Sequence, residues 1–390
     1  MRVQFTSFLS GRIISFRRIR VMTVKELLQL LRDTVLMGFI VYAFLGDVYL
    51  AGSGVKLQLT QAATVVNDAD HSFASRDLIY RFQLPYFRLD GQVKNGREGV
   101  NLMDHGKAMV VIDIPPQFGE SLLKGERTAV QMQVNTTNSI PGFLAATYAT
   151  QIVAQYGLET SLKRLGYAID DPLTGPMILE QHRVWFNPNQ NETWFVSILE
   201  LSNIITVLAI LLPGAAMVRE KERGTVEQLL VSPLSPLEIM VPKVLAMSVM
   251  ILVGTALSVF LILEPVFHVP IEGSLFLFFA VTSLYVFTLA GFGLFAATIG
   301  RNLAEVGMLT ILIVLPMIFL SGTWTPPEAM PKWLLIVTLL SPLHYYSDVG
   351  YGIFLKGAGL SILWDSVLCI VLLGGAVFGF GLWRFRRQFA

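Results

Sequence analysis

The sequence has a single cysteine and few charged residues in its 390 positions. Cys369 lies within an apolar run, so an intramolecular disulfide and a metal site of paired cysteines are both excluded. Charged residues make up 15% of the chain, whereas a soluble domain carries about 25%. Hydrophobic residues make up 53%, and the mean hydropathy is +0.59. This composition indicates a membrane protein.

Catalytic motifs are also missing. The sequence contains no G-x-x-x-x-G-K-[ST] phosphate-binding loop, no H-E-x-x-H metal motif and no G-x-S-x-G nucleophile motif. Its five histidines are scattered along the chain and form no metal-ligand spacing. The formal net charge of +1 gives no sign of a nucleic-acid partner. We therefore predict that this chain is not an enzyme and holds no metal or cofactor of its own.

The sequence contains several long apolar runs. A membrane-spanning helix needs roughly 20 mostly apolar residues, and six stretches approach that length. They cover residues 34–51, 195–218, 244–263, 275–299, 306–322 and 361–383. A further apolar stretch, 333–340, is too short to span and is interpreted as an interfacial segment within an outer re-entrant hairpin at 323–360. The fold class expected is a membrane protein with an all-α region of six transmembrane helices.

The basic residues predict the orientation, because loops on the cytoplasmic side carry an excess of lysine and arginine. Both ends of the chain are rich in them, before the first span and in the tail at 384–390. They are Arg2, Arg12, Arg17, Arg18, Arg20, Lys25, Arg32, Arg384, Arg386 and Arg387. Both termini are therefore expected in the cytoplasm. Six spans agree with this, because an even number of spans places the two termini on the same side of the membrane.

The N-terminal segment, 1–33, mixes basic and apolar side chains. Over 13–31 this pattern fits an amphipathic helix lying along the inner leaflet, or equally an ordinary cytoplasmic extension of the first span. The segment 52–190 follows that span and is long enough for a domain with its own core. It combines short β-rich runs at 63–67, 108–114, 129–135 and 182–187 with a helical stretch at 139–165. We expect an α/β extracytoplasmic domain inserted between spans 1 and 2.

The region from 191 to 383 carries the other spans and an inner loop at 219–243, "REKERGTVEQLLVSPLSPLEIMVPK". Alternating charges favour a short helix at its start, and the two prolines of "SPLSP" favour a turn. Ser235 and Glu238 fit a capping box for a second helix. A plain connection needs only a few residues. The loop is therefore interpreted as a docking surface, rather than a solvated connection.

This loop resembles the signature loop of type-2 ABC exporter permeases, the drug, polysaccharide and lipid exporter class. Other segments are similar to that family in the same order along the chain. They are "VVNDADHSFASRDLIYRFQLPYFRL" (65–89), "VVIDIPPQFGESLLKGE" (110–126), "RVWFNPNQNETWFV" (183–196) and the region 320–357. Pro242 departs from the small residue expected before Lys243. The resemblance covers nearly the whole chain.

The resemblance implies a permease subunit of an ATP-driven exporter in the bacterial inner membrane. It implies separate ABC ATP-binding subunits that bind ATP and magnesium, a second permease subunit in a homodimer or heterodimer, and a possible periplasmic adaptor protein. The residues it assigns to coupling with the ATPase are Glu220, Glu222, Arg223, Gly224, Thr225 and Glu227.

Ionisable groups within a span usually face protein or water and mark functional sites. Glu200 lies in the second apolar run with Asn203 one turn further, and both are candidates for the transport pathway or a dimer interface. Two alternatives remain open at the level of sequence. One is a membrane-anchored receptor or scaffold with an extracytoplasmic ligand-binding domain, and the other is an ion-coupled carrier.

Overall fold

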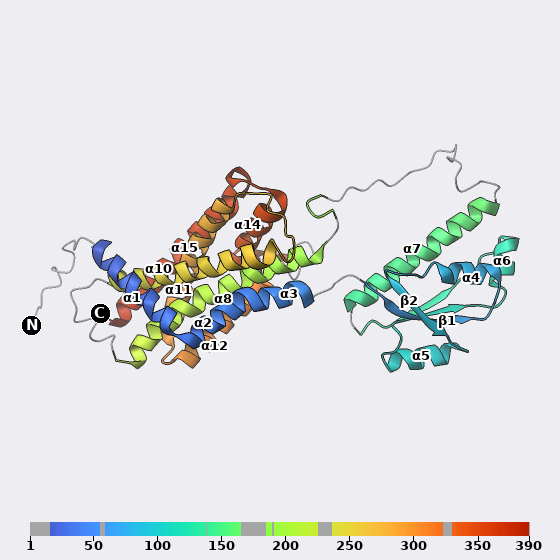
Figure 1. The fold of residues 1–390 in the computed structure, drawn as a ribbon, viewed down its shortest axis with the longest axis horizontal. Helices are drawn as coiled ribbons and strands as arrows, with labels where there is room; N and C mark the ends of the chain where they lie inside the picture. The colour runs from blue at the N-terminus through green and yellow to red at the C-terminus, as the bar shows by residue number, and fades with distance from the viewer. Residues whose placement is uncertain are drawn as a thin grey trace, which may run out of the picture. The chain divides into compact units, whose positions relative to one another are not determined.

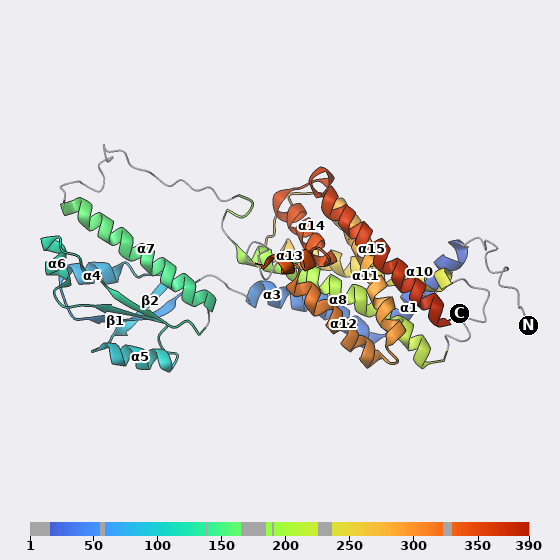
Figure 2. The ribbon, with the colours of Figure 1, turned by 180° about the vertical axis from the view of Figure 1, so that it is seen from behind.

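The computed structural model describes residues 16–54, 59–137, 139–164, 185–188, 191–224, 236–322 and 330–389. The chain divides into two compact units (Figures 1 and 2). The membrane unit comprises residues 1–55 and 184–390, and the sheet unit comprises residues 56–183. The boundaries of the sheet unit lie close to those predicted for the inserted domain, 52–190.

The membrane unit is built of helices. In chain order they are α1 (Phe16–Arg32), α2 (Thr34–Val41), η1 (Tyr42–Asp47), α3 (Val48–Gly54), α8 (Glu192–Glu222), α10 (Pro236–Ser258), η2 (Val259–Leu263), α11 (Leu275–Ile299), α12 (Leu303–Phe319), α13 (Lys332–Thr338), α14 (Pro342–Lys356) and α15 (Leu360–Phe389). The elements η1 and η2 are wider π-helical turns that continue their neighbours, so α2 to α3 form one rod and α10 to η2 another.

Five helical rods among the described residues are long and apolar enough to cross a membrane: Thr34–Gly54, Glu192–Glu222, Leu237–Leu263, Leu275–Ile299 and Leu360–Gly381. The remaining predicted span, 306–322, corresponds to α12, an apolar helix of 17 residues. At 1.5 Å per residue it is about 26 Å long, slightly less than the apolar core of a bilayer. The count of six spans therefore stays a prediction.

Close backbone contact joins α11 to its neighbours on both sides. Gly293 of α11 lies against α8, where a Cβ would be 2.1 Å from the carbonyl oxygen of Ile210. Gly291 of the same helix lies against the backbone of Phe378 in α15, where a Cβ would be 2.8 Å away. Small residues allow helices in membranes to pack at short distance. These glycines place α11 tightly between α8 and α15.

Polar pairs also join helices in the core of the membrane unit. The hydroxyl groups of Thr206 in α8 and Tyr285 in α11 are 2.8 Å apart, and those of Thr282 and Tyr346 are at the same distance. The rings of Tyr285 and Tyr346 stack with centroids 4.0 Å apart. Each tyrosine hydroxyl thus has a partner, as a buried polar group requires. This arrangement fixes α14 against α8 and α11.

The sheet unit contains strands β1 (Ala62–Asp68), β2 (Phe87–Gln92), β3 (Val110–Ile114) and β4 (Gln131–Val134), in the order β2-β1-β3-β4. Strand β1 pairs in parallel with β2 and β3, and β4 is antiparallel to β3. The helices are α4 (Phe73–Tyr80), α5 (Gly96–Asp104), α6 (Phe118–Lys124) and α7 (Ser139–Arg164). Branched side chains of β1 and β3, including Val66 and Ile112, form the core with α7 residues such as Ala145.

Two strand predictions were wrong. The run 182–187 is not a strand where it is described, from 185 onward, because Phe186 has a left-handed φ of 66° that interrupts an extended chain. Residues 182–184 lie outside the described residues. Strand β2 was missed, since its sequence carries charge and a glycine at Arg88, Asp90 and Gly91. Such residues are depleted in strands, and only pairing with β1 makes this one extended.

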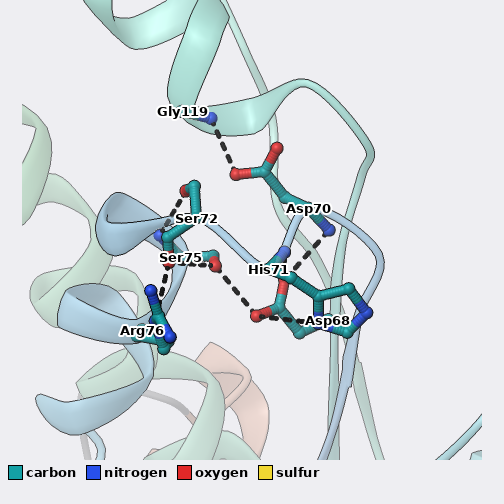
Figure 3. A network of polar contacts seen from close by, with 7 residues as sticks. All are labelled: Asp68, Asp70, His71, Ser72, Ser75, Arg76 and Gly119. Atoms are coloured by element: carbon teal, nitrogen blue, oxygen red, sulfur yellow. Dashed lines mark hydrogen bonds and ion pairs between the residues drawn. The ribbon is translucent and has the colours of Figure 1, made fainter.

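A polar network fixes two loops where β1 and β3 end (Figure 3). The carboxylate of Asp68 accepts hydrogen bonds from the backbone N–H groups of Asp70 and His71 and from the hydroxyl of Ser75. Asp70 in turn accepts one from the backbone N–H of Gly119, at the start of α6. The network caps the turn into α4 and ties it to the turn into α6, and we assign it a structural role.

An ion pair in the sheet unit gives a pH prediction. Arg81 Nη2 lies 2.5 Å from Glu159 Oε2 and holds the pKa of that carboxyl group below its usual value. The pair therefore stabilises the fold above about pH 4.5 and loses this effect as the pH falls through the lowered pKa. We expect Glu159→Gln to cost about 0.5 kcal/mol at pH 7, because solvent screens the pair, and less at pH 3. The change in stability can be measured at both pH values from hydrogen exchange of the α4 and α7 peptides in the whole protein, corrected for intrinsic exchange rates.

The matched control is Glu120→Gln, which removes a pair with Lys124 whose side chains are both 56% exposed. We expect no measurable change there at either pH. An equal effect of both substitutions, or an effect of Glu159→Gln that grows in acid, would contradict the prediction.

Candidate coupling site and membrane pocket

A buried lysine joins three helices at the end of the membrane unit that carries α1. Lys243 of α10 is 2% exposed, and its Nζ lies 2.9 Å from Glu26 Oε1 of α1 and 2.7 Å from Glu220 Oε1 of α8. Glu26 is also buried, and α1 packs along α10 (Figure 1). A buried charge requires opposite charges and hydrogen bonds around it. The three helix segments are therefore held to one another at this point.

Two further ion pairs surround this lysine. Arg219 Nη1 of α8 lies 2.9 Å from Asp33 Oδ2, the residue between α1 and α2. The backbone N–H of Leu36 and the Arg219 guanidinium lower the pKa of Asp33, which caps the start of α2. Arg18 of α1 lies 3.8 Å from Glu238 of α10. We call these pairs, together with Glu26, Lys243 and Glu220, the charged cluster.

The end of α8 leads from this cluster to the surface. Glu222 accepts a hydrogen bond of 3.0 Å from the backbone N–H of Leu303, the first residue of α12. Arg223 caps the helix, and Gly224 follows with a φ of 66°, a conformation that favours glycine. All three are exposed, whereas Glu220 points into the cluster. The four predicted coupling residues that the structure describes thus divide into one inward and three outward positions.

The predicted loop 219–243 is shorter in the structure than in the sequence analysis. Residues 219–222 continue α8, and 236–243 are the first residues of α10, so no separate short helix starts at Arg219. No glycine or proline lies between Val218 and Glu222, so the sequence there does not interrupt α8. The next glycine along the chain is Gly224, directly after the residue that caps the helix. Thr225 and Glu227, together with Ser235 of the predicted capping box, lie outside the described residues.

Most members of the charged cluster were not predicted from the sequence. Glu26 lies in the segment 13–31, predicted to be either an amphipathic helix on the inner leaflet or an extension of the first span, and Lys243 in the predicted inner loop. A signal existed for Lys243, because it stands directly before a long apolar run that begins at Val244. A lysine in that position needs a partner when its helix packs against others. Its partner Glu26 is 217 positions away, and sequence spacing gives no hint of it.

The second candidate region, Glu200 and Asn203, faces a pocket bounded by η1, α8 and α12. Its volume is about 380 Å³, and its wall is mostly apolar. Asn203 Nδ2 donates to Glu200 Oε2 at 3.2 Å, and Asp47 of η1 lines the same pocket. The two carboxyl groups are close enough to interact electrostatically. We call this space the membrane pocket.

Comparison with known proteins supplies the family. A family model described as "ABC-2 family transporter protein" matches residues 34–384. The Escherichia coli (strain K12) protein "Inner membrane transport permease YhhJ" is 34% identical over 364 residues, covering 93% of this chain and 96% of the relative.

Two further Escherichia coli relatives match over most of their length. "Probable multidrug ABC transporter permease YbhR" is 28% identical over 374 residues, covering 96% of this chain and 99% of the relative. "Probable multidrug ABC transporter permease YbhS" is 29% identical over 388 residues, covering 96% of this chain and 97% of the relative. The resemblance seen in the sequence motifs is thereby confirmed. This chain belongs to the ABC-2 family of transporter proteins and is a type-2 membrane permease subunit of an ABC transporter.

Proposed function

We propose that this chain forms the translocation pathway of an ATP-driven exporter and takes its energy from separate ATP-binding subunits. In this proposal it has six spans, both termini in the cytoplasm of a bacterial cell, and no catalytic activity or cofactor of its own. The relatives named inner-membrane and multidrug permeases support this assignment. The absence of a phosphate-binding loop motif from the sequence agrees with it.

The observation that carries the coupling part of the proposal is the bridge from Lys243 to Glu26 and Glu220. The exposed residues Glu222 and Arg223 follow directly on the same rigid helix. A force applied to this exposed end is transmitted to α1 and α10, because the buried ion pairs make the helix ends move together. Mixed charges at a docking surface contribute specificity and orientation of the partner.

The proposal includes further partners. A second permease subunit, in a homodimer or a heterodimer, would complete the pathway. A periplasmic adaptor protein would dock on the sheet unit, which is the part of the chain expected outside the membrane. The family supports the second permease subunit, the adaptor rests on the predicted topology alone, and each can be tested by co-purification.

The test is a pull-down of the tagged chain from native membranes, assayed for ATPase activity. The variant Glu222→Ala/Arg223→Ala removes exposed charge at the end of α8 and leaves the bridge of Lys243 intact. We expect ATPase recovery to fall about tenfold, which corresponds to roughly 1.4 kcal/mol of lost contact energy. The matched control is Lys356→Ala, an exposed lysine at the end of α14. It should recover the parent's activity.

Two results would reject the proposal. One is a parent chain that brings down no ATPase, which would favour the receptor or carrier alternatives. The other is equal recovery with the double variant and with the parent, which would place the docking surface elsewhere.

A further inference from the structure

We propose that the membrane pocket binds a lipophilic organic cation as cargo. This inference rests on the proposed function, because it names the class of substrate that the exporter would carry. The pocket volume of about 380 Å³ lies in the range of small-molecule sites.

The charge in the pocket is of one sign. Glu200 and Asp47 line it, and no basic residue is among its lining residues in the described part of the chain. An acidic group in an apolar wall is costly to ionise, and a bound cation stabilises its charged form. An anionic cargo would be repelled by ionised acidic groups, and a neutral cargo would give their charge no partner.

An unpaired amide oxygen points to the same occupant. Asn203 is 7% exposed, and its Oδ1 is buried with no hydrogen-bond partner among the described residues. Its amide nitrogen already donates to Glu200, so the free group is an acceptor. A buried acceptor without a partner is costly. A ligand with a positive charge or a donor group satisfies Oδ1 and both carboxylates together.

The wall supplies the apolar contact. The rings of Phe39, Tyr42 and Phe319 line the pocket, beside aliphatic residues such as Val207 and Leu315. Aromatic faces attract organic cations, an interaction that strengthens when water is excluded. A bare metal ion fits poorly here, since calcium takes six to eight oxygen ligands, and the described residues contain no metal-binding group of three acidic, histidine or cysteine side chains.

The π-helical turn η1 shapes this wall. A Cβ on Gly46 would be 2.8 Å from the ring of Tyr42, so glycine leaves room for that ring to lie along its own helix. Within this turn the carbonyl group of Phe44 accepts a hydrogen bond from the hydroxyl of Ser258 in α10. Single π-turns within α-helices are frequent at functional sites. Here the turn ends at Asp47, which lines the pocket.

The rim of the pocket is accessible in the membrane unit. Phe39 is 46% exposed and Tyr42 is 53% exposed. These apolar rings lie in Thr34–Gly54, a rod long enough to cross the bilayer. A lipophilic cation partitioning into the membrane therefore meets an apolar rim first and the carboxylates further in.

The experiment measures binding of radiolabelled tetraphenylphosphonium to the purified full chain in nanodiscs of zwitterionic phosphatidylcholine, with the signal of empty nanodiscs subtracted. We expect saturable binding that triphenylphosphine oxide, an uncharged molecule of similar aromatic shape, does not compete for. Glu200→Gln and Asp47→Asn should each weaken binding about tenfold, the loss expected for a charge-assisted contact. Asp47→Asn is the second variant in case Glu200→Gln fails to fold. The matched control Glu264→Gln, at an exposed helix end outside the pocket, should bind like the parent.

Absence of saturable binding to the parent, or parent-like binding by both folded pocket variants, would overturn the inference. The assay contains no ATPase, so its failure is separate from failure of the proposed function. If the pull-down recovers an ATPase but the cation does not bind, the exporter assignment stands and only the cargo class falls. If the cation binds but no ATPase is recovered, the site stands and the ATP-driven mechanism falls.

Discussion

Replacing Lys243 by methionine is expected to be among the most destabilising single changes in the membrane unit. Methionine keeps an unbranched chain of similar length but removes the ammonium group that lies between Glu26 and Glu220. The two carboxylates then lose the buried ammonium group that they share, although the half-exposed Lys25 stays 3.6 Å from Glu26 Oε1. Breaking a buried ion pair by removing one partner costs about 3–5 kcal/mol. Thermal unfolding of the purified chain in detergent should show a clear fall in Tm.

Two controls separate the charge effect from the loss of packing. Lys332→Met removes an exposed lysine of α13 and should stay within about 0.5 kcal/mol of the parent. The triple variant Glu26→Gln/Glu220→Gln/Lys243→Met leaves no unpaired charge at the centre of the cluster, so much of the lost stability should return. If the triple variant is less stable than Lys243→Met alone, the bridge does not work as described.

The substitution Gly293→Ala is expected to separate α8 from α11. A Cβ at this position would be 2.1 Å from the carbonyl oxygen of Ile210 and 3.2 Å from the backbone nitrogen of Gly214. Backbone atoms within a helix cannot rotate away as a side chain can, so the two helices must move apart. Overpacking of this kind costs about 1–3 kcal/mol, and the backbone contact puts this site at the upper end. A lower Tm and a broader peak in size-exclusion chromatography measure it.

The matched control is Gly307→Ala in α12, where a Cβ would meet nothing within 4 Å. Alanine has the higher helix propensity, so this variant should be as stable as the parent or slightly more so. Equal destabilisation by both substitutions would mean that the effect comes from the helices themselves and not from the contact between α8 and α11.

Much of the organisation could be predicted from the sequence. Long apolar runs such as 275–299 predicted helices with nearly the observed bounds, because a span must satisfy its backbone hydrogen bonds within itself. The α/β unit and its long helix at 139–165 were also predicted closely. The family was evident from local motifs, above all the stretch at 219–243. Such features depend on residues that are close together in the sequence, so they can be read from the sequence alone.

The arrangement of the candidate sites was decided by tertiary structure alone. Helix α8 is apolar on nearly all sides, so its sequence did not reveal that Glu220 points inward or that Asn203 lines a pocket. The bridge of Lys243 to Glu26 and the meeting of Asp47 with Glu200 join residues far apart in the chain. Apolar periodicity determines that a helix is buried, whereas close packing of particular side chains determines which helices meet and at what rotation.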